Sequence, residues 1–468
     1  MSFSATGQVK FRSRFVQTQE YKEESMANEV LFRSTFRTQR PARMVGDALC
    51  LNNAFDLKLK NLANTNAVAW GGKLLALYEA GVPILLDPHT LETVGEYDLG
   101  LGDALRSGIS VRVPSLLSAF PALHARLFGA SMTAHPKIDA ARDRLVSWTW
   151  QAEVSPDRGP LDTRPMLSIY EWDRDLKVLE PPVLHRLEST TVAPHDFSLT
   201  RDYYVLVENR LSGDVTPYLL GKTCPAECVS IEPASDMILN LVPRPSGRKA
   251  GSPALRIPLD TPGFTIHSAC AFQDGPDDGR LTLITTGWLT DTVKGGKVRG
   301  GLLGSWEGTA PQFDNIPLTL LYKTEVDIES ATLLSHAPAS GLEQTIIEHP
   351  HANPLYEGRP TRFLYMSVGS QTGISSPPLG YLRLDLSTGE KQVWMAPLHT
   401  YCEEVVVVPM DGMDGEDDVW VLVTMLDAVK NRSCVAVLDG RDVAKGPVCR
   451  VWLRHHLPHS LHGCFAKM

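Results

Sequence analysis

The stretch YLRLDLSTGEKQVW, residues 381–394, carries the local pattern that decides the fold class. Two short β-type runs flank Ser387, Thr388 and Gly389, which favour a tight turn. The stretch therefore predicts a β-hairpin of the kind that forms the outer strands of a propeller blade. Related runs recur along the chain, among them DYYVLVEN (202–209), RLTLITTGWL (280–289), EEVVVVPM (403–410) and DVWVLVTMLD (418–427). Strands of about five to eight residues with frequent turns predict an all-β protein, and the chain length favours a propeller over a simple sandwich.

The composition is that of a globular protein with a large core, since 43% of the 468 residues are hydrophobic and 21% are charged. The net charge of −9, without a long lysine or arginine run, argues against a nucleic-acid partner. The chain has no uninterrupted apolar run of about 18 residues, so no membrane span is expected. The opening MSFSATGQVKFRSRF lacks the apolar core of a secretory signal, and the eight cysteines are scattered. These features predict a cytoplasmic or plastid protein that is not secreted.

One segment breaks the β pattern. VPSLLSAFPALHARLFGA, residues 113–130, places Leu116, Phe120 and Leu123 along one side of a predicted helix. We expect a helical cap packed on the propeller; the alternative is a membrane-facing segment or the wall of a substrate entrance. With this segment as its cap, the whole chain, residues 1–468, is expected to form a single propeller domain.

Four of the fourteen histidines lie in short motifs with small or turn-forming neighbours. They are His135 in TAHPKID, His195 in PHDFSLT, His267 in FTIHSACAFQDG and His462 in LPHSLHG. A lone histidine is more often a surface or satisfied core residue than a metal ligand. Their separations of 60, 72 and 195 residues are too long for one helix or hairpin to bring them together. A closed ring of blades can do so, because the innermost strand of each blade faces one axis.

Seven motifs occur in one order along the chain. They are NTNAVAWGGKLLALYEAG, TAHPKID, PHDFSLTRDYYVLVEN, IHSACAFQDG, IEHPHANPLYEGRPTRFLYM, EEVVVVPMDG and LPHSLHG. Any one of them is a weak signal, but together, from about residue 8 to the end, they resemble the carotenoid cleavage oxygenase family. The resemblance implies an all-β, seven-bladed β-propeller with a helical or loop cap over its top face. That family usually begins with an earlier strand, so the first blade is expected to be incomplete at the N-terminus.

The resemblance also implies a ferrous iron ion, Fe(2+), on the propeller axis. By motif match its ligands are His135, His195, His267 and His462. Imidazole is a good ligand for divalent iron and binds as the neutral base. Four neutral ligands leave room at the metal for dioxygen and water.

Three glutamates match the family motifs for residues that accept a hydrogen bond from a ligand imidazole. They are Glu79 in YEAG, Glu348 in IEHP and Glu404 in EVVVVP. Such a carboxylate fixes the orientation and tautomer of the ring. Glu403 is the adjacent alternative to Glu404, but the number of residues between the glutamate and Pro409 in the sequence favours Glu404.

The implied reaction is oxidative cleavage of one C=C double bond of a carotenoid or apocarotenoid. The partners are an apolar polyene and O2, and the products are two carbonyl compounds, aldehydes or ketones. No organic cofactor is required, and peripheral membrane contact stays an alternative for the cap segment.

Three other activities stay open on the same fold. They are stilbene-type cleavage, retinoid isomerisation and inactive apocarotenoid binding. Stilbene cleavers of this family often carry a lysine immediately before the glutamate of EAG, to hold a phenol. Here that position is Tyr78, which argues against stilbenes.

Overall fold

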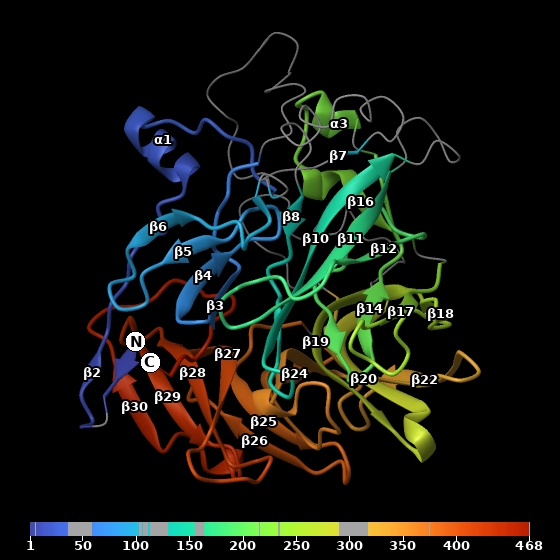
Figure 1. Cartoon of the computed structure of the whole chain (residues 1–468). Helices are drawn as coiled ribbons and strands as arrows, with labels where there is room; N and C mark the ends of the chain where they lie inside the picture. The colour runs from blue at the N-terminus through green and yellow to red at the C-terminus, as the bar shows by residue number, and fades with distance from the viewer. Residues whose placement is uncertain are drawn as a thin grey trace.

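The computed structural model describes residues 1–4, 6–35, 59–102, 105, 111–112, 130–154, 163–214, 216–232, 235–289, 317–373 and 375–467. Apart from Ala130, the expected cap segment 113–130 lies outside the described residues. Sheets are arranged as a ring, and the helices α1 (Gln19–Ala27) and α3 (Thr216–Leu219) lie at one end of the molecule (Figure 1). In the parts of the chain described, no helix is long and apolar enough to cross a membrane.

Six sheets of four or more strands make up the ring. The first consists of β3 (Asn66–Trp70), β4 (Lys73–Leu77), β5 (Ile84–Leu86) and β6 (Thr93–Glu96). The second consists of β7 (Val111–Arg112), β8 (Ser131–Met132), β9 (Lys137–Asp139), β10 (Arg144–Val154), β11 (Thr163–Trp172) and β12 (Val183–Arg186). The third consists of β13 (Ser198–Leu199), β14 (Tyr203–Glu208), β17 (Ile238–Pro243) and β18 (Leu255–Pro258).

The remaining three sheets are antiparallel meanders in which consecutive strands pair. The fourth consists of β19 (Gly263–Asp274), β20 (Arg280–Leu289), β21 (Leu320–Asp327) and β22 (Thr332–Pro338). The fifth consists of β23 (Thr345–Ala352), β24 (Phe363–Thr372), β25 (Gly380–Asp385) and β26 (Lys391–Met395). The sixth consists of β27 (Thr400–Pro409), β28 (Val419–Asp427), β29 (Arg432–Asp439) and β30 (Cys449–Trp452).

The expectation of seven blades is wrong, because the described residues form six such sheets. Two further pairs, β1 (Ser2–Phe3) with β2 (Val9–Lys10) and β15 (Leu211–Gly213) with β16 (Val229–Ile231), are two-stranded and do not make a blade. The first sheet has its four strands, so the expected incomplete first blade is not found either. Local strand and turn signals predict hairpins, whereas the number seven came from the resemblance alone.

The hairpin predicted over residues 381–394 is confirmed as β25 and β26, the outer strands of the fifth sheet. At its turn, Asp385 Oδ1 accepts hydrogen bonds from the backbone N–H of Ser387 at 2.9 Å and of Thr388 at 3.3 Å. Gly389 adopts a φ of +74°, a conformation that glycine reaches at little cost. β25 is buried throughout, whereas β26 alternates between exposed and partly buried residues, as an edge strand does.

Apolar clusters fill the space between consecutive sheets. Trp172 and Leu75 belong to the cluster between the first and second sheets, and Trp148 and Phe197 to that between the second and third. Comparable clusters join the third sheet to the fourth, the fourth to the fifth and the fifth to the sixth. From the first to the sixth, each pair of consecutive sheets therefore shares an apolar core, the arrangement that a propeller requires.

The two chain ends bridge the sixth sheet and the first. In the C-terminal segment, the His462 N–H donates to the Thr65 carbonyl at 3.1 Å, directly before β3. In the N-terminal segment, Arg14 Nε donates to the Thr90 carbonyl at 2.8 Å. The Phe11 ring lies 5.3 Å from the ring of His455, so the two ends also meet each other. These contacts close the ring.

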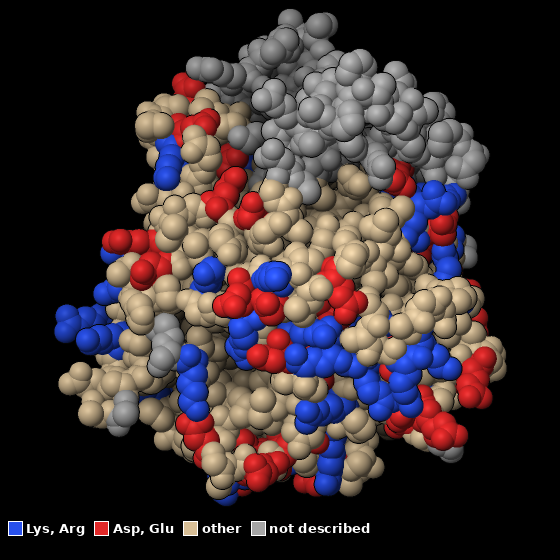
Figure 2. All heavy atoms as spheres, in the orientation of Figure 1, with Lys and Arg blue, Asp and Glu red and all other residues tan. Residues whose placement is uncertain are grey.

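Basic and acidic side chains are interspersed on the face shown in Figure 2. Ion pairs such as Arg174 with Asp143 at 2.6 Å and Arg201 with Asp278 at 2.7 Å are typical of the surface charges. Exposed pairs of this kind contribute little to stability, so the fold depends mainly on the apolar clusters between sheets.

Candidate metal centre

The four histidines singled out in the sequence converge on one point. His135 lies just before β9, His195 just before β13, His267 within β19, and His462 in the C-terminal segment beyond β30. One ring nitrogen from each residue can be chosen such that all four lie within 4.8 Å of one another. Such a group of nitrogen donors could hold one metal ion.

The ring geometry is compact. His135 Nε2 and His195 Nε2 are 3.1 Å apart, and the rings of His267 and His462 have centroids 4.9 Å apart. Burial lowers the pKa of His135 and of His267 well below the ordinary value, and the neighbouring imidazoles lower it further. Both rings are therefore held in the neutral form, which is the form that binds a metal.

Two of the predicted glutamates each accept a hydrogen bond from the outer nitrogen of a histidine in this group. His267 Nδ1 donates to Glu348 Oε2 at 2.8 Å, and His462 Nδ1 donates to Glu404 Oε1 at 2.6 Å. Burial raises the pKa of Glu348. Burial alone would also raise the pKa of Glu404, but hydrogen bonds from His351 and His462 lower it far below the ordinary value. In both pairs Nε2 is left free to face the common point.

The third glutamate, Glu79, contacts His195 Nδ1 through Oε1 as an ion pair. Burial lowers the pKa of His195, but the carboxylates of Glu79, Asp196 and Glu348 together raise it above the ordinary value. Among the described residues, His135 has no carboxylate hydrogen bond. The three carboxylates therefore face three of the four histidines.

β-Bulges aim these side chains at the centre. The pairing of β19 with β20 shifts register around His267, between Thr265 and Ser268. The pairing of β23 with β24 shifts after Glu348, and that of β27 with β28 shifts between Cys402 and Val405. A bulge re-aims side chains that regular alternation would send to opposite faces. The last of these bulges surrounds both Glu403 and Glu404, and both are buried.

Two histidines near the centre had not been singled out in the sequence. The His349 ring centroid lies 5.8 Å from that of His267 and 5.7 Å from that of His462. His349 adopts a φ of +52°, and burial lowers its pKa to about 4. His351 Nε2 lies 3.0 Å from Glu404 Oε1. Both follow Glu348 in the motif IEHPHANP. Their place in this motif is the sequence signal that could have identified them.

A cavity of about 300 Å³ near the centre of the ring is lined by three of the four histidines, His135, His267 and His462. Residues of β3, β9, β19, β23 and β27 line it. Within it, Lys137 Nζ lies 2.8 Å from Asp196 Oδ1, and Asp196 Oδ2 accepts a hydrogen bond from the Ser268 N–H at 2.8 Å. Glu357 also lines the cavity. One side of the histidine group therefore faces a space in which these charged groups lie among apolar residues such as Val68 and Val406.

Comparisons with known proteins agree with this architecture. The family model described as retinal pigment epithelial membrane protein matches residues 1–467. Apocarotenoid-15,15'-oxygenase of Synechocystis sp. is 30% identical over 478 residues, which cover 99% of this chain and 84% of the relative. Carotenoid cleavage dioxygenase 7, chloroplastic, of Oryza sativa subsp. japonica is 26% identical, over 93% of this chain and 75% of the relative.

A solved structure is similar over almost the whole chain. The crystal structure of cobalt-substituted Synechocystis apocarotenoid oxygenase superposes with a TM-score of 0.78 and 29% identity, covering 97% of this chain and 84% of that one. The family expected from the sequence motifs is therefore confirmed. Matched by the family model over nearly its whole length, the chain belongs to the retinal pigment epithelial membrane protein family, which includes carotenoid cleavage oxygenases.

Proposed function

We propose that this protein is a non-haem iron(II) dioxygenase that cleaves a C=C double bond of a carotenoid or apocarotenoid, using O2, into aldehyde or ketone products. The observation that carries the proposal is the four-histidine group with carboxylates behind three of its rings. His135, His195, His267 and His462 are proposed to hold the metal through their inner nitrogens.

The donor set fits a divalent transition metal. Four imidazoles bind as neutral ligands, and the nearby carboxylates offset the charge of a divalent ion in a site of low solvent access. Imidazoles also suit zinc, but zinc has no redox chemistry. The oxygenase relatives therefore favour iron, which supplies dioxygen activation when bound.

The protein's own residues fix the geometry of the site. Glu348 and Glu404 hold the outer nitrogens of His267 and His462, so that each ring keeps one tautomer and one orientation. A polyene requires apolar walls. The axial cavity contains the Lys137–Asp196 ion pair, so we infer that the polyene binds outside that cavity, on another side of the centre.

The stilbene alternative is disfavoured by the environment of Tyr78. This side chain is buried, and its hydroxyl is hydrogen-bonded to the Thr35 hydroxyl. Burial raises the pKa of Tyr78 to about 12. Tyr78 thus offers no cation for a phenol at the position where family stilbene cleavers often carry lysine. Retinoid isomerisation and inactive apocarotenoid binding are separated from cleavage by product analysis.

The proposal is tested by mass spectrometry of products from iron-reconstituted protein incubated with β-carotene, an apocarotenal and a stilbene. We expect carbonyl fragments from a carotenoid or apocarotenoid, and one oxygen atom from dioxygen in each fragment. An isomerised but intact polyene, or binding without turnover in fully iron-loaded protein, would overturn the proposal.

Two histidine variants test the assignment of ligands. His267→Ala is expected to abolish both iron binding and turnover, because it removes a buried donor of the group. His455→Ala, on an exposed histidine of the C-terminal segment, is expected to leave both near normal. Iron stoichiometry and turnover are measured for both variants, and equal loss in the two would contradict the assignment.

Cellular location, membrane contact and partners stay predictions. We propose a cytoplasmic or plastid location, and the rice relative is named a chloroplastic protein. We propose that the protein does not bind nucleic acid, and peripheral membrane contact stays the alternative for the cap segment 113–130.

A further inference from the structure

The segment that carries His462 differs from those that carry the other three histidines. We call residues 453–467 the tail; it follows β30 and has no regular secondary structure. His267 lies within a strand, and His135 and His195 lie two and three residues before the first residues of β9 and β13. The position of His462 therefore depends on single contacts rather than on a β-ladder. The His462 N–H donates to the Thr65 carbonyl at 3.1 Å, and side chains of β27 hold the residues on either side.

Two consecutive glutamates of β27 hold two successive parts of the tail. Glu403 accepts hydrogen bonds from His459 Nδ1 at 2.9 Å, from the Ser460 N–H at 3.3 Å and from the Ser460 hydroxyl at 3.4 Å. Glu404 accepts from His462 Nδ1 at 2.6 Å and from the Gly463 N–H at 2.9 Å. The bulge between Cys402 and Val405 allows both carboxylates to reach the tail.

The Glu403 contacts are directional and involve a buried charge. Glu403 is 6% exposed, whereas the side chain of its partner His459 is 71% exposed. Among the described residues, no lysine or arginine pairs with Glu403. Burying a carboxylate is costly unless donors satisfy it, so this carboxylate and the tail stabilise each other.

We propose that Glu403, through His459 and Ser460, is a positioning residue that clamps the tail and thereby places His462 at the metal centre. Glu404 orients the imidazole ring, and Glu403 fixes the chain just before it. The part of this inference that concerns metal rests on the proposed function, whereas the clamp itself can be tested in metal-free protein.

Hydrogen exchange in the metal-free protein tests the clamp. Glu403→Gln and His459→Ala are each expected to speed exchange about tenfold in peptides covering residues 457–467. Glutamine has one acceptor oxygen in place of two, so it cannot serve His459 Nδ1 and the Ser460 N–H together. His459→Ala removes the donor that holds the Glu403 carboxylate in place. His459→Asn is expected to retain protection, since its amide can donate from nearly the position of His459 Nδ1. The control is His456→Ala, an exposed histidine of the same tail.

Metal retention tests the consequence. We expect Fe(II) to be lost to a chelator about tenfold faster from Glu403→Gln and His459→Ala than from wild type, and at the wild-type rate from His459→Asn and His456→Ala. Unchanged tail exchange in both Glu403→Gln and His459→Ala would overturn the clamp. Faster exchange with unchanged metal loss would overturn its role in placing His462. Wild-type protein that binds no iron would instead contradict the proposed function, while the exchange result would still decide the clamp.

Discussion

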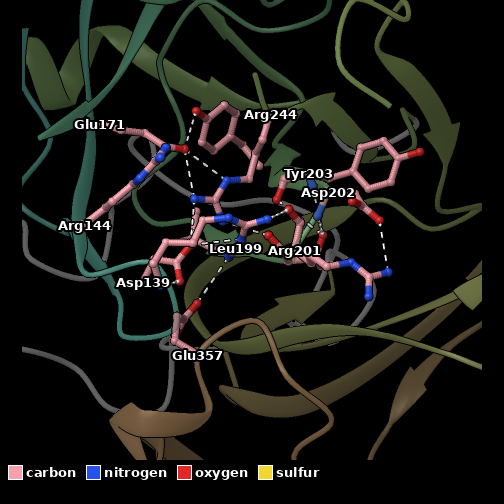
Figure 3. A network of polar contacts seen from close by, with 12 residues as sticks. Asp139, Arg144, Glu171, Leu199, Arg201, Asp202, Tyr203, Arg244 and Glu357 are labelled. Atoms are coloured by element: carbon pink, nitrogen blue, oxygen red, sulfur yellow. Dashed lines mark hydrogen bonds and ion pairs between the residues drawn. The ribbon is translucent and has the colours of Figure 1, made fainter. Parts of the chain in front are cut away.

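Glu357 is a partly buried carboxyl group between two cavities. It lines both the axial cavity and a second cavity of about 220 Å³ that is also lined by Arg142, Arg201 and Arg244. Its Oε1 accepts a hydrogen bond from the Leu199 N–H at 3.2 Å (Figure 3). Burial raises the pKa of Glu357 to about 7, and the charge of Lys137 opposes this only in part.

The raised pKa of Glu357 predicts that this residue makes the stability of the fold depend on pH. The unfolded chain releases the Glu357 proton near the ordinary value of 4.5, whereas the folded chain holds it to about 7. The stability that this group contributes is therefore complete below about pH 4.5 and is lost as pH rises through 7. We expect Glu357→Gln to be about 1–3 kcal/mol more stable than wild type at pH 8 and similar to it at pH 4.5, in urea unfolding at both values.

The control for this variant is Glu329→Gln, which removes one negative charge from an exposed turn. If the two variants show the same difference from wild type at both pH values, the cost does not come from the buried site. Glutamine can still accept the Leu199 N–H, so loss of that hydrogen bond does not complicate the comparison.

At the level of residues, motif matching predicted the histidines and glutamates of the candidate centre. It could not predict side-chain directions that depend on β-bulges. His135, His195, His267 and His462 were singled out from their motifs, and the structure brings them together. Alternation along a strand would send Glu403 and Glu404 to opposite faces, so the sequence offered a choice between them. The bulge in β27 lets both act on the tail, and no local sequence rule places such a bulge.

Among the elements, the second and third sheets are joined by a charged network around Arg244 (Figure 3). Arg244 directly follows β17, is 1% exposed and lies 2.7 Å from Asp139 Oδ2 and 2.9 Å from Glu171 Oε1. It also donates to the Thr200 carbonyl at 2.9 Å. Asp139 ends β9, close after His135, and Thr200 follows β13, close after His195. The network therefore supports two of the segments that carry histidines of the centre.

Arg244→Met is expected to destabilise the protein strongly, by about 3–5 kcal/mol, because it leaves two buried carboxylates without their main partner. Burial alone would raise the pKa of both Asp139 and Glu171, and Arg244 is the main group that lowers each of them. The free energy of unfolding is measured in urea near neutral pH. The matched control, Arg280→Met, removes the partly exposed pair with Asp274 and is expected to cost less than about 1 kcal/mol. An equal loss of unfolding free energy in the two variants would show that the buried Arg244 network stabilises the fold no more than a partly exposed ion pair.

The hairpins were predictable, whereas their grouping into blades was not. The turn at Ser387, Thr388 and Gly389 has a local signal in its polar side chains and its glycine. The second sheet instead collects three short strands beside the long β10, and β7 pairs with β10 in parallel. The pairing of Val111 in β7 with Ala152 in β10 joins residues far apart in sequence, and it depends on packing between neighbouring sheets rather than on local propensity.

For the whole molecule, we propose that residues 1–468 form a single domain. Apolar clusters couple each sheet to the next, and the chain ends couple the last sheet to the first. In the described part of the chain, the five largest apolar clusters each combine strands of two neighbouring sheets, so these sheets share their cores. A ring of this kind is expected to unfold in one cooperative transition, measured by calorimetry.

Removal of residues 1–17 tests how far the chain ends close the ring. Val16 packs against the cluster of Ala76, Ile84 and Leu86 on the first sheet, and Gln17 N–H donates to Thr93 Oγ1 at 2.9 Å. Loss of this apolar contact and of the hydrogen bonds to the first sheet should lower the free energy of unfolding by about 2–4 kcal/mol. No residue of the proposed metal centre lies in this segment, so iron stoichiometry should stay at the wild-type value. Unchanged stability would show that the tail alone closes the ring, and loss of iron would show that closure also sets the geometry of the centre.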